Sequence, residues 1–548
     1  MKKYIIPFIL LFASLISCDV NDTLDIPQKG VLSTDLYKTA TDEQTLGFIA
    51  AIHAKIRGKY YEDRILGSTA CAFSIRANLD QMSGDFAQYY SFTETAGGST
   101  YKKMWSYYYT NIYWCNMIII NLPENTVASQ EVKDRAVAEA RVIRAIMMMQ
   151  LVQLWGNPPL ADHIMDGTEG NTPAATSWAF IEKELNEAAL SLPSKNGPDG
   201  QVAFGSRLTK EAAYAYLGKA YLWEGKYSDA ASTLYSKVIA TNLYSLVADY
   251  TKLNSYTSDL SAEYIWECNI QNDPAIALSQ AGLMDAVLNW APASLNIPDG
   301  YYDGVGWNDV AYASESFGVF MENHEQLTNG KKTARYRGTL ASYEELIDPT
   351  LFTYSNGNKG SKTGGSGYCE GYFRLKLIPR KENIMGGTSW PTQFMHNNLP
   401  YMRYSEVLLN YAEAVAKGGN SGAISGLEAL NIVRRRAGLQ DASALDMNNE
   451  QYGVKAERRA ELFFEGTRFI DLVRWKDFDK LSGVNNSYSP MFYGYVDGNN
   501  GTQQSKANWK IVKNPILAER FKTGKNELFP IPTSDINANP NLVQNPGW

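Results

Sequence analysis

The chain has 548 residues, 45% of them hydrophobic, which supplies a large core and argues against a disordered protein. Its formal net charge of −7 argues against a nucleic-acid partner, which would call for a basic face, and against electrostatic docking on an anionic membrane. The cysteines form no CxxC pair, which argues against a zinc site and a disulfide framework. Aromatic content is high at 12%, and many rings fall in Gly- and Asn-rich stretches, a first indication of ligand type.

The first eighteen residues read as an export signal. Two lysines precede an apolar run over 4–16, which is shorter than the about 20 residues that span a bilayer. Leu15-Ile16-Ser17-Cys18 resembles the lipobox of bacterial lipoproteins, where cleavage precedes a cysteine that receives diacylglycerol. We therefore expect a signal peptide over 1–17, a lipidated Cys18 and a tether over 18–34. Two or more acyl chains would hold this end stably at a membrane.

The segment that follows the tether has helical periodicity over 35–57. Its predicted apolar face consists of Leu46, Ile49, Ala50 and Ile56, and His53 lies beside that face. We interpret His53 as a packed core residue rather than a ligand. Residues 71–100 have no clear period and several loop formers, and they predict an irregular surface loop.

Three further helices are expected over 102–121, 130–155 and 177–192. The second of these should stop at the Gly-Asn-Pro-Pro run of 156–159. The first carries an aromatic and apolar stripe at steps of three and four residues, which we interpret as core packing. The stripe consists of Trp105, Tyr109, Ile112, Tyr113 and Asn116.

The clearest repeat signal lies over 203–241 and follows the tetratricopeptide pattern of two antiparallel helices. Small residues such as Gly218 and Ala231 let the helices approach, and Tyr221 and Tyr235 fill the space between them. Neighbouring helical patterns look like degenerate copies. Helical patterns return over 400–417, 427–437 and 454–475, and residues 529–548 are expected to be extended.

Residues 269–399 interrupt the helical rhythm with Gly, Asn, Tyr and Trp. They predict a loop-rich part with small hairpins and short strand-like runs, such as 371–378. Aromatic residues gather here and in the 71–100 loop, next to carboxylates and amides. A sugar presents a face of C–H groups that packs on a flat ring, and its hydroxyls need polar groups at the edge. The predicted glycan contacts are Trp307, Trp290, Tyr301, Tyr302, Asp80, Tyr89, Tyr90 and Asn78.

The sequence contains no recognisable catalytic motif. The four histidines lack HExxH spacing, GxSxG is missing, and the glycines of 357–367 do not have the phosphate-loop register. Glu457, Glu461 and Glu465 recur every four residues among arginines, which favours a structural ion network over an acid–base pair. The aspartates at 299, 303 and 309 could bind calcium but do not fit the twelve-residue calcium loop. We expect no catalysis and no cofactor or metal.

Two segments of the second half are especially distinctive, RRAELFFEGTRFIDLVRW at 458–475 and the C-terminal 529–548. Further distinctive segments lie at 24–27, 139–145, 155–160, 204–213 and 400–414. Together these segments resemble the SusD/RagB family, the surface glycan-binding lipoproteins of Bacteroidetes, and the resemblance runs nearly end to end.

The resemblance implies a mainly α fold with a tetratricopeptide-like scaffold of helix pairs. Residues 35–548 would form one domain, with scaffold helices at about 102–241 and 400–475 and a loop-rich ligand-binding insertion at about 269–399. It implies an outer-membrane protein that faces the exterior, captures oligo- or polysaccharide and delivers it to a SusC-like TonB-dependent barrel. Trp307 aligns with one ring of the family's starch site, and Asp80 and Tyr90 fall in the loop that carries others.

Three other functions remain open at this point. A RagB-like protein would take oligopeptides in the same role. A hydrolase on this scaffold would release reducing ends from a glycan. A purely structural lid for the barrel would bind no ligand of its own.

Overall fold

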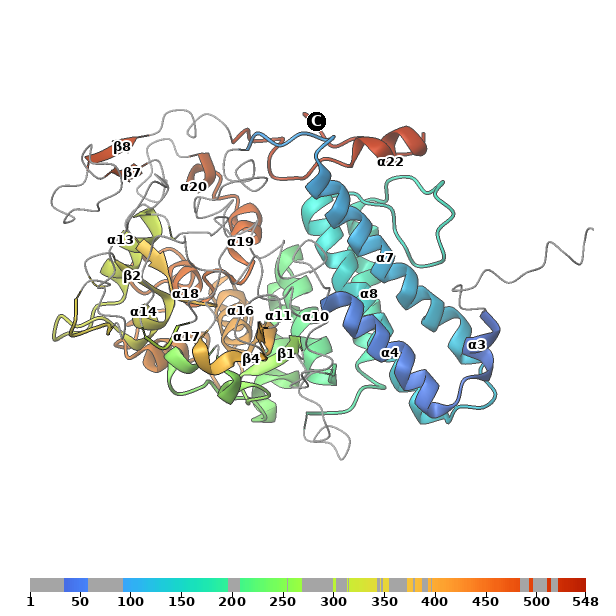
Figure 1. Cartoon of the computed structure of the whole chain (residues 1–548), viewed down its shortest axis with the longest axis horizontal. Helices are drawn as coiled ribbons and strands as arrows, with labels where there is room; N and C mark the ends of the chain where they lie inside the picture. Colours follow the sequence, from blue (N-terminus) through green and yellow to red (C-terminus); the bar gives the residue numbers. More distant parts are fainter. Residues whose placement is uncertain are drawn as a thin grey trace, which may run out of the picture.

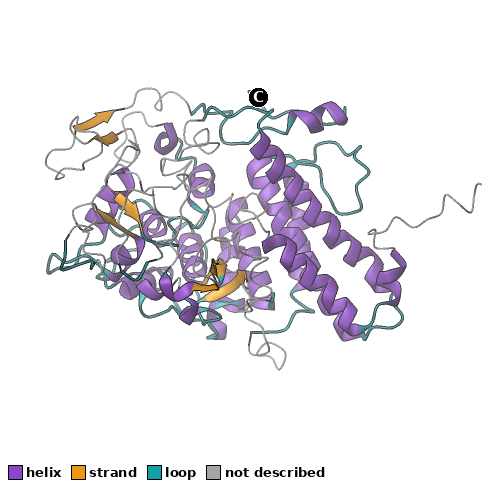
Figure 2. Ribbon diagram, viewed as in Figure 1, coloured by secondary structure: helices purple, strands orange, loops and turns teal. Residues whose placement is uncertain are grey.

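The structure is a computed structural model that describes residues 34–57, 92–195, 207–253, 255–268, 299–301, 313, 315–342, 345, 348–353, 372–377, 380–386, 393–395, 397–482, 492–495, 510–513 and 521–548. In these residues helices dominate, with small two-stranded sheets between them (Figure 2). The predicted mainly α fold is therefore confirmed. No helix of the described part is long and apolar enough to cross a membrane.

Long helices form one end of the molecule, where α4, α7 and α8 lie side by side (Figure 1). The helix α8 has the predicted range, α7 and α9 each begin three residues early, and α9 ends four residues before its predicted end. The bounds are α3 Thr34–Thr39, α4 Asp42–Arg57, α7 Ser99–Asn121, α8 Gln130–Trp155 and α9 Ala174–Ala188. Gly156, at φ +72°, ends α8 as predicted.

The pattern over 35–57 forms two helices rather than one. Thr41 starts the second helix, because its hydroxyl accepts from Gln44 N while its own N–H donates to Gln44 Oε1 at 2.9 Å. This reciprocal capping defines a new helix start. The predicted apolar face is also partly wrong: Ile49 and Ile56 are buried, but Leu46 is 37% exposed.

The tetratricopeptide-like pair consists of α10 (Lys210–Glu224) and α11 (Tyr227–Lys237), which pack together as predicted. The close approach occurs at Gly218, where a Cβ atom would lie 2.4 Å from Leu234 Cγ. The left-handed Gly225, at φ +74°, ends α10. Next to this pair, α11 packs against α16 (Tyr404–Ala416), which packs against α17 (Gly426–Ala437).

We expect Gly218→Val to lower the free energy of unfolding by about 1–3 kcal/mol, because the buried Leu234 leaves no room for a branched side chain. Gly47→Val is the matched control, since Gly47 is an exposed position of α4 where an added Cβ would meet nothing within 4 Å. This change should shift stability by less than about 0.5 kcal/mol. Urea denaturation followed by circular dichroism measures both, and equal midpoints would contradict the close packing.

The loop-rich part contains hairpins, as predicted, and also two helices that the sequence did not predict, α13 (Glu315–His324) and α14 (Ala334–Thr339). The strands pair antiparallel as β1–β6, β2–β3, β4–β5 and β7–β8. Their bounds are β1 Tyr264–Cys268, β2 Leu340–Ser342, β3 Tyr372–Arg374, β4 Ile384–Gly386, β5 Gln393–Met395, β6 Leu399–Arg403, β7 Phe492–Tyr495 and β8 Lys510–Lys513.

Two predicted helices are interrupted or shortened. Residues 400–403, expected to begin a helix, belong to β6, where Pro400 lies opposite Glu267 of β1. The range 454–475 divides into α18 (Val454–Glu461) and α19 (Arg468–Trp475). Phe464 and Gly466 between them have left-handed φ values of +63° and +76°, which a continuous right-handed helix cannot contain.

Short helices complete the described chain. They are η3 Leu122–Glu124, η4 Ile239–Thr241, η5 Tyr250–Lys252, η6 Tyr256–Ser258, η8 Lys381–Asn383, α20 Asp479–Ser482 and α22 Thr533–Ala538. The C-terminal segment, expected to be extended, contains only α22 and is otherwise without regular structure.

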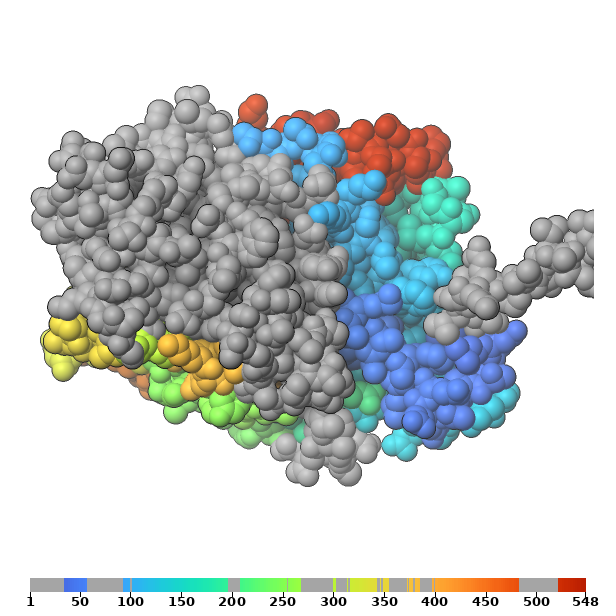
Figure 3. Space-filling view, in the orientation of Figure 1, coloured from blue at the N-terminus to red at the C-terminus, as the bar shows by residue number. Residues whose placement is uncertain are grey.

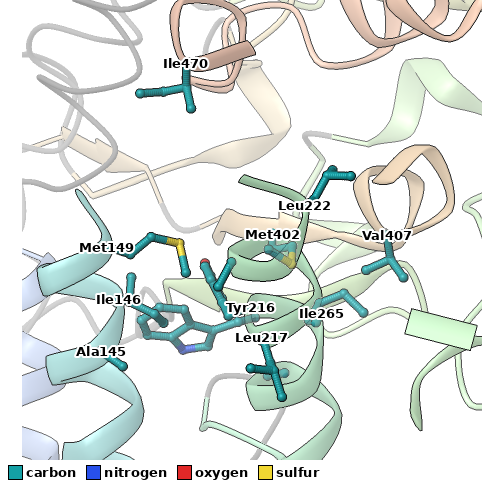
Figure 4. Close-up of a cluster of buried hydrophobic side chains, with 14 of the residues drawn as sticks. Ala145, Ile146, Met149, Tyr216, Leu217, Leu222, Ile265, Met402, Val407 and Ile470 are labelled. Carbon is teal, nitrogen blue, oxygen red and sulfur yellow. The ribbon is translucent and has the colours of Figure 1, made fainter. Parts of the chain in front are cut away.

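The hydrophobic core joins the helical end to the second half of the chain. Ile146 and Met149 of α8, Tyr216 of α10 and Met402 of β6 converge in one buried cluster (Figure 4). Burial of such side chains contributes about 1.5–3 kcal/mol each. The scaffold is therefore continuous from α8 through α10 to the two-stranded β1–β6 sheet.

Candidate ligand-binding site

Most of the predicted ligand residues lie outside the described residues. This holds for Trp307, Trp290, Tyr302, Asn78, Asp80, Tyr89 and Tyr90, and for the predicted lipidation site Cys18. Their roles stay predictions. Tyr301 is the one member of the predicted glycan-contact set that the structure describes.

Tyr301 is packed, with 9% of its surface exposed. It forms an isolated antiparallel bridge with Arg380, whose guanidinium carbon lies 5.5 Å from the ring centroid. Burial raises the pKa of the Tyr301 hydroxyl. Arg380 in turn donates to Thr251 O at 2.6 Å, which ties this point to η5. In this conformation Tyr301 offers little free ring face, and it anchors the start of the 301–307 stretch to the scaffold.

The glutamates of α18 belong to a buried ion network, as their spacing among arginines predicts. Arg335 of α14 contacts Glu457 at 2.5 Å and Glu461 at 3.1 Å, and Arg403 of β6 contacts Glu461 at 2.8 Å. Arg436 of α17 also pairs with Glu461. These four elements are therefore joined through one carboxylate. The remaining acidic members are Glu263, Glu325 and Glu465.

The partners of this network differ from the arginines that are adjacent in sequence. Arg458 pairs with Asp471, and Arg474 pairs with Glu413 and Asp471, in a separate group. Burial alone would raise the pKa of Glu461, but the surrounding arginines hold it far below its usual value. In the same way Arg335 helps to lower the pKa of Glu325 to about 2. A lowered pKa and close cationic partners at Glu461 and Glu325 are the chemistry of a structural network rather than of a catalytic acid.

A cavity of about 570 Å³ lies along α7, and we call it the α7 cavity. One wall carries the predicted aromatic stripe, and the others come from residues 159–169 and from the C-terminal segment near α22. The C-terminal segment packs beside α7 in Figures 1 and 3. The lining residues are Trp105, Ser106, Tyr109, Thr110, Ile112, Tyr113, Asn116, Pro159, Ala161, His163, Met165, Asp166, Gly167, Glu169, Asp535, Ala538, Asn539 and Leu542.

The interpretation of the stripe as core packing is correct for only part of it. Trp105, Ile112 and Asn116 are buried, but Tyr113 is 40% exposed and lines the α7 cavity together with Tyr109. The polar residues in and beside the stripe were the sequence signal that this face of α7 lines a cavity. A stripe that serves only as core would not be expected to carry an asparagine, with Ser106 and Thr110 beside it, facing the same space.

Within the described residues no group of three or more His, Cys, Asp or Glu side chains could hold a metal ion. His53, interpreted as a packed residue, is partly buried and contacts Glu139 through Nε2 at 3.2 Å. Asp299, one of the weighed calcium ligands, accepts from the Thr353 hydroxyl at 2.9 Å. Asp303 and Asp309 lie outside the described residues.

Comparisons with known proteins cover both halves of the chain. A family model described as "SusD family" matches residues 263–548, and one described as "Starch-binding associating with outer membrane" matches residues 44–222. A SusD-like protein of Bacteroides ovatus is 23% identical over 73% of this chain and 70% of that protein. The starch-binding protein SusD of Bacteroides thetaiotaomicron is 23% identical over 75% of this chain and 72% of that protein.

Solved structures share the fold. The surface glycan-binding protein A of Bacteroides thetaiotaomicron, solved in complex with laminarihexaose, superposes with a TM-score of 0.67 at 20% identity. The match covers 92% of this chain and 100% of that one. Because a family model matches more than half of the sequence and the fold agrees along nearly all of it, the chain belongs to the SusD family.

Proposed function

We propose that this protein is a cell-surface lipoprotein that captures oligo- or polysaccharide and hands it to a SusC-like TonB-dependent barrel in the outer membrane. The observation that carries the proposal is the pair of family matches, one of which is described as starch-binding and outer-membrane associated. Relatives named for starch and for a laminarihexaose complex support a glycan as the ligand class. The lipobox-like segment ending at Cys18 supports the membrane anchor.

In this proposal the ligand is bound and not cleaved. The relatives named above are binding proteins, and the carboxylates that recur on α18 are occupied by arginines. Trp307 and Trp290 would supply flat faces for sugar rings, while Asp80 and Asn78 would meet hydroxyls at the edge. The buried ion network and Tyr301 would hold the scaffold from which these loops extend. No metal is required for this mode of binding.

Trp307→Ala tests the proposed contact. We expect it to weaken binding of the retained polysaccharide by about tenfold or more, since a stacked aromatic ring and its buried area are lost together. Affinity electrophoresis measures the change, with circular dichroism as a check that helicity is kept. Tyr256→Ala is the control, because it truncates another aromatic ring that is 44% exposed. Equal retardation of the two variants would remove Trp307 from the site.

A further inference from the structure

We infer that the α7 cavity is a second ligand site, separate from the loop residues proposed above, and that it takes a single neutral sugar ring. The volume of about 570 Å³ falls within the range of small-molecule sites. The inference rests on the proposed glycan-binding function for its ligand class. Its geometry rests on described residues alone.

The cavity is held open by hydrogen bonds on the α7 side. The Tyr109 hydroxyl donates to Pro159 O at 2.9 Å, which fixes the ring against the segment that follows α8. The Asn116 amide donates to Ala161 O at 3.2 Å, and its oxygen accepts from Arg144 at 2.7 Å. These contacts fix the floor and one wall, so little ordering is needed when a ligand enters.

The C-terminal wall is fixed in the same way. The Asn539 amide donates to Glu169 O at 2.8 Å, and the Asn541 amide donates to Thr168 O at 2.7 Å. The Asn171 amide donates to Val543 O at 3.1 Å, and Val543 N donates back to Asn171 Oδ1. The segment near α22 is thus attached to residues 168–171 by four side-chain hydrogen bonds, and the cavity is preformed.

The lining combines the groups that a sugar ring needs. Tyr113, at 40% exposure, presents a ring at the edge of the cavity, and Tyr109 and Trp105 lie along the same wall with their centroids 4.8 Å apart. C–H groups of a pyranose pack on such rings. Ser106 and Thr110 add hydroxyl groups that both donate and accept. Sugar hydroxyls also do both, which favours them over a ligand with donors only.

The charge of the lining selects against anionic sugars. Asp166, Glu169 and Asp535 line the cavity, and His163 is the only basic lining residue. Hydrogen bonds from Thr168 lower the pKa of Asp166. Burial opposes ionisation of Glu169, but backbone N–H groups hold its pKa below the usual value. Three carboxylates against one histidine give the lining an excess of acidic groups, which would repel a uronic acid.

A lysine or arginine side chain is the rival ligand, since it would be attracted by the same charge. All three carboxylates already have donors from the protein, and Asp535 accepts from the Ser534 hydroxyl at 2.8 Å. Glu169 accepts from Asp166 N at 2.9 Å and Gly167 N at 3.0 Å, and Asp166 accepts from Thr168 N at 2.9 Å. His163 Nε2 also contacts Glu169 at 3.2 Å. Because these carboxylates already accept hydrogen bonds from the protein, the remaining polar groups of the lining both donate and accept. Such a lining favours a neutral sugar ring over a lysine or arginine side chain.

The test uses the full-length protein purified in detergent. Saturation-transfer NMR and titration at neutral pH would compare glucose, galactose and mannose with glucuronic and galacturonic acids and with a lysine tripeptide. We expect at least one neutral sugar to bind and the acids not to bind. Tyr113→Ala should weaken that binding by about fivefold or more, whereas Tyr256→Ala should leave it unchanged. Asp535→Asn should reduce the difference in affinity between the neutral sugar and the uronic acids, without loss of helicity.

Three results would overturn the inference: no neutral sugar binds, Tyr113→Ala binds as well as wild type, or the tripeptide competes with better affinity. Affinity electrophoresis of the same samples keeps the proposed function separate. If polysaccharide is retarded equally by wild type and Tyr113→Ala and no monosaccharide effect is seen, the second site fails and the proposed function stands. If monosaccharides bind in the α7 cavity but no polysaccharide is retarded, polysaccharide capture fails and the second site stands.

Discussion

Glu461→Ala is expected to destabilise the protein by about 3–5 kcal/mol, because it leaves buried cations without their shared partner. Arg335, Arg403 and Arg436 all contact this carboxylate, and they come from α14, β6 and α17. The loss would thus loosen the connection between the loop-rich part and the helical scaffold. Urea denaturation followed by circular dichroism measures the effect.

Arg435→Ala is the matched control for this prediction. Arg435 also has two acidic partners, Glu428 at 2.7 Å and Asp441 at 2.6 Å, but its side chain is 48% exposed. Solvent screens such pairs, so the change should be much smaller than for Glu461. A loss in Glu461→Ala no larger than in Arg435→Ala would contradict the structural role of the network.

The same network predicts a loss of stability in acid. The folded-state pKa values of Glu325, at about 2, and of Glu461 lie below the ordinary glutamate value. Protons therefore bind more tightly to the unfolded chain, and the stabilisation is present above a pH of about 4.3 and is lost as the pH falls toward the folded-state values. The urea concentration at the unfolding midpoint should decrease as the pH is lowered from neutral to about 3. This decrease should be smaller in Glu461→Ala than in wild type.

Trp155→Ala is expected to cost about 3–5 kcal/mol, since a fully buried indole is replaced by a cavity. The Trp155 ring lies 5.3 Å from Trp105 and 5.6 Å from Phe529, measured between centroids. Its Nε1 donates to Pro530 O at 2.8 Å. The Asn545 amide donates to Trp155 O at 3.0 Å, so this residue holds the C-terminal segment from two sides.

Trp155→Phe separates packing from hydrogen bonding. It keeps most of the ring but loses the donor to Pro530, and we expect a smaller loss of about 1–3 kcal/mol. Thermal unfolding gives the order of stability, and limited proteolysis reports release of residues 529–548. If Trp155→Ala unfolded at the same temperature as wild type and residues 529–548 stayed protected from proteolysis, the indole would not be what attaches the C terminus.

Much of the helical scaffold could be predicted from local sequence pattern. The bounds of α8 agree with the prediction because its apolar period is regular and a Gly-Asn-Pro-Pro run stops it. The α10–α11 pair followed from the tetratricopeptide pattern over 203–241, in which the small residue Gly218 allows the close approach. The interruption between α18 and α19 and the strand β6 were missed, because the first depends on left-handed φ values and the second on pairing with the distant β1.

The candidate sites were less predictable for the same reason. The α7 cavity forms where residues near 160 and residues near 535 lie against one face of α7. These segments are far apart in the sequence, so a local pattern cannot predict their contact. The ion network likewise joins Glu461 to Arg335 across 126 positions. Local pattern could suggest aromatic rings with polar neighbours as sugar contacts, and Tyr301, which packs on Arg380, shows that ring type alone does not predict exposure.

Glycan capture without cleavage can be tested by affinity electrophoresis of the full-length chain against a panel of neutral and acidic polysaccharides, with reducing-end release measured on the same samples. We expect retardation by at least one polysaccharide and no release of reducing ends. Release of reducing ends would contradict a binding protein. No retardation by any polysaccharide, together with saturable binding of an oligopeptide mixture, would contradict glycan capture and assign the chain a peptide ligand instead.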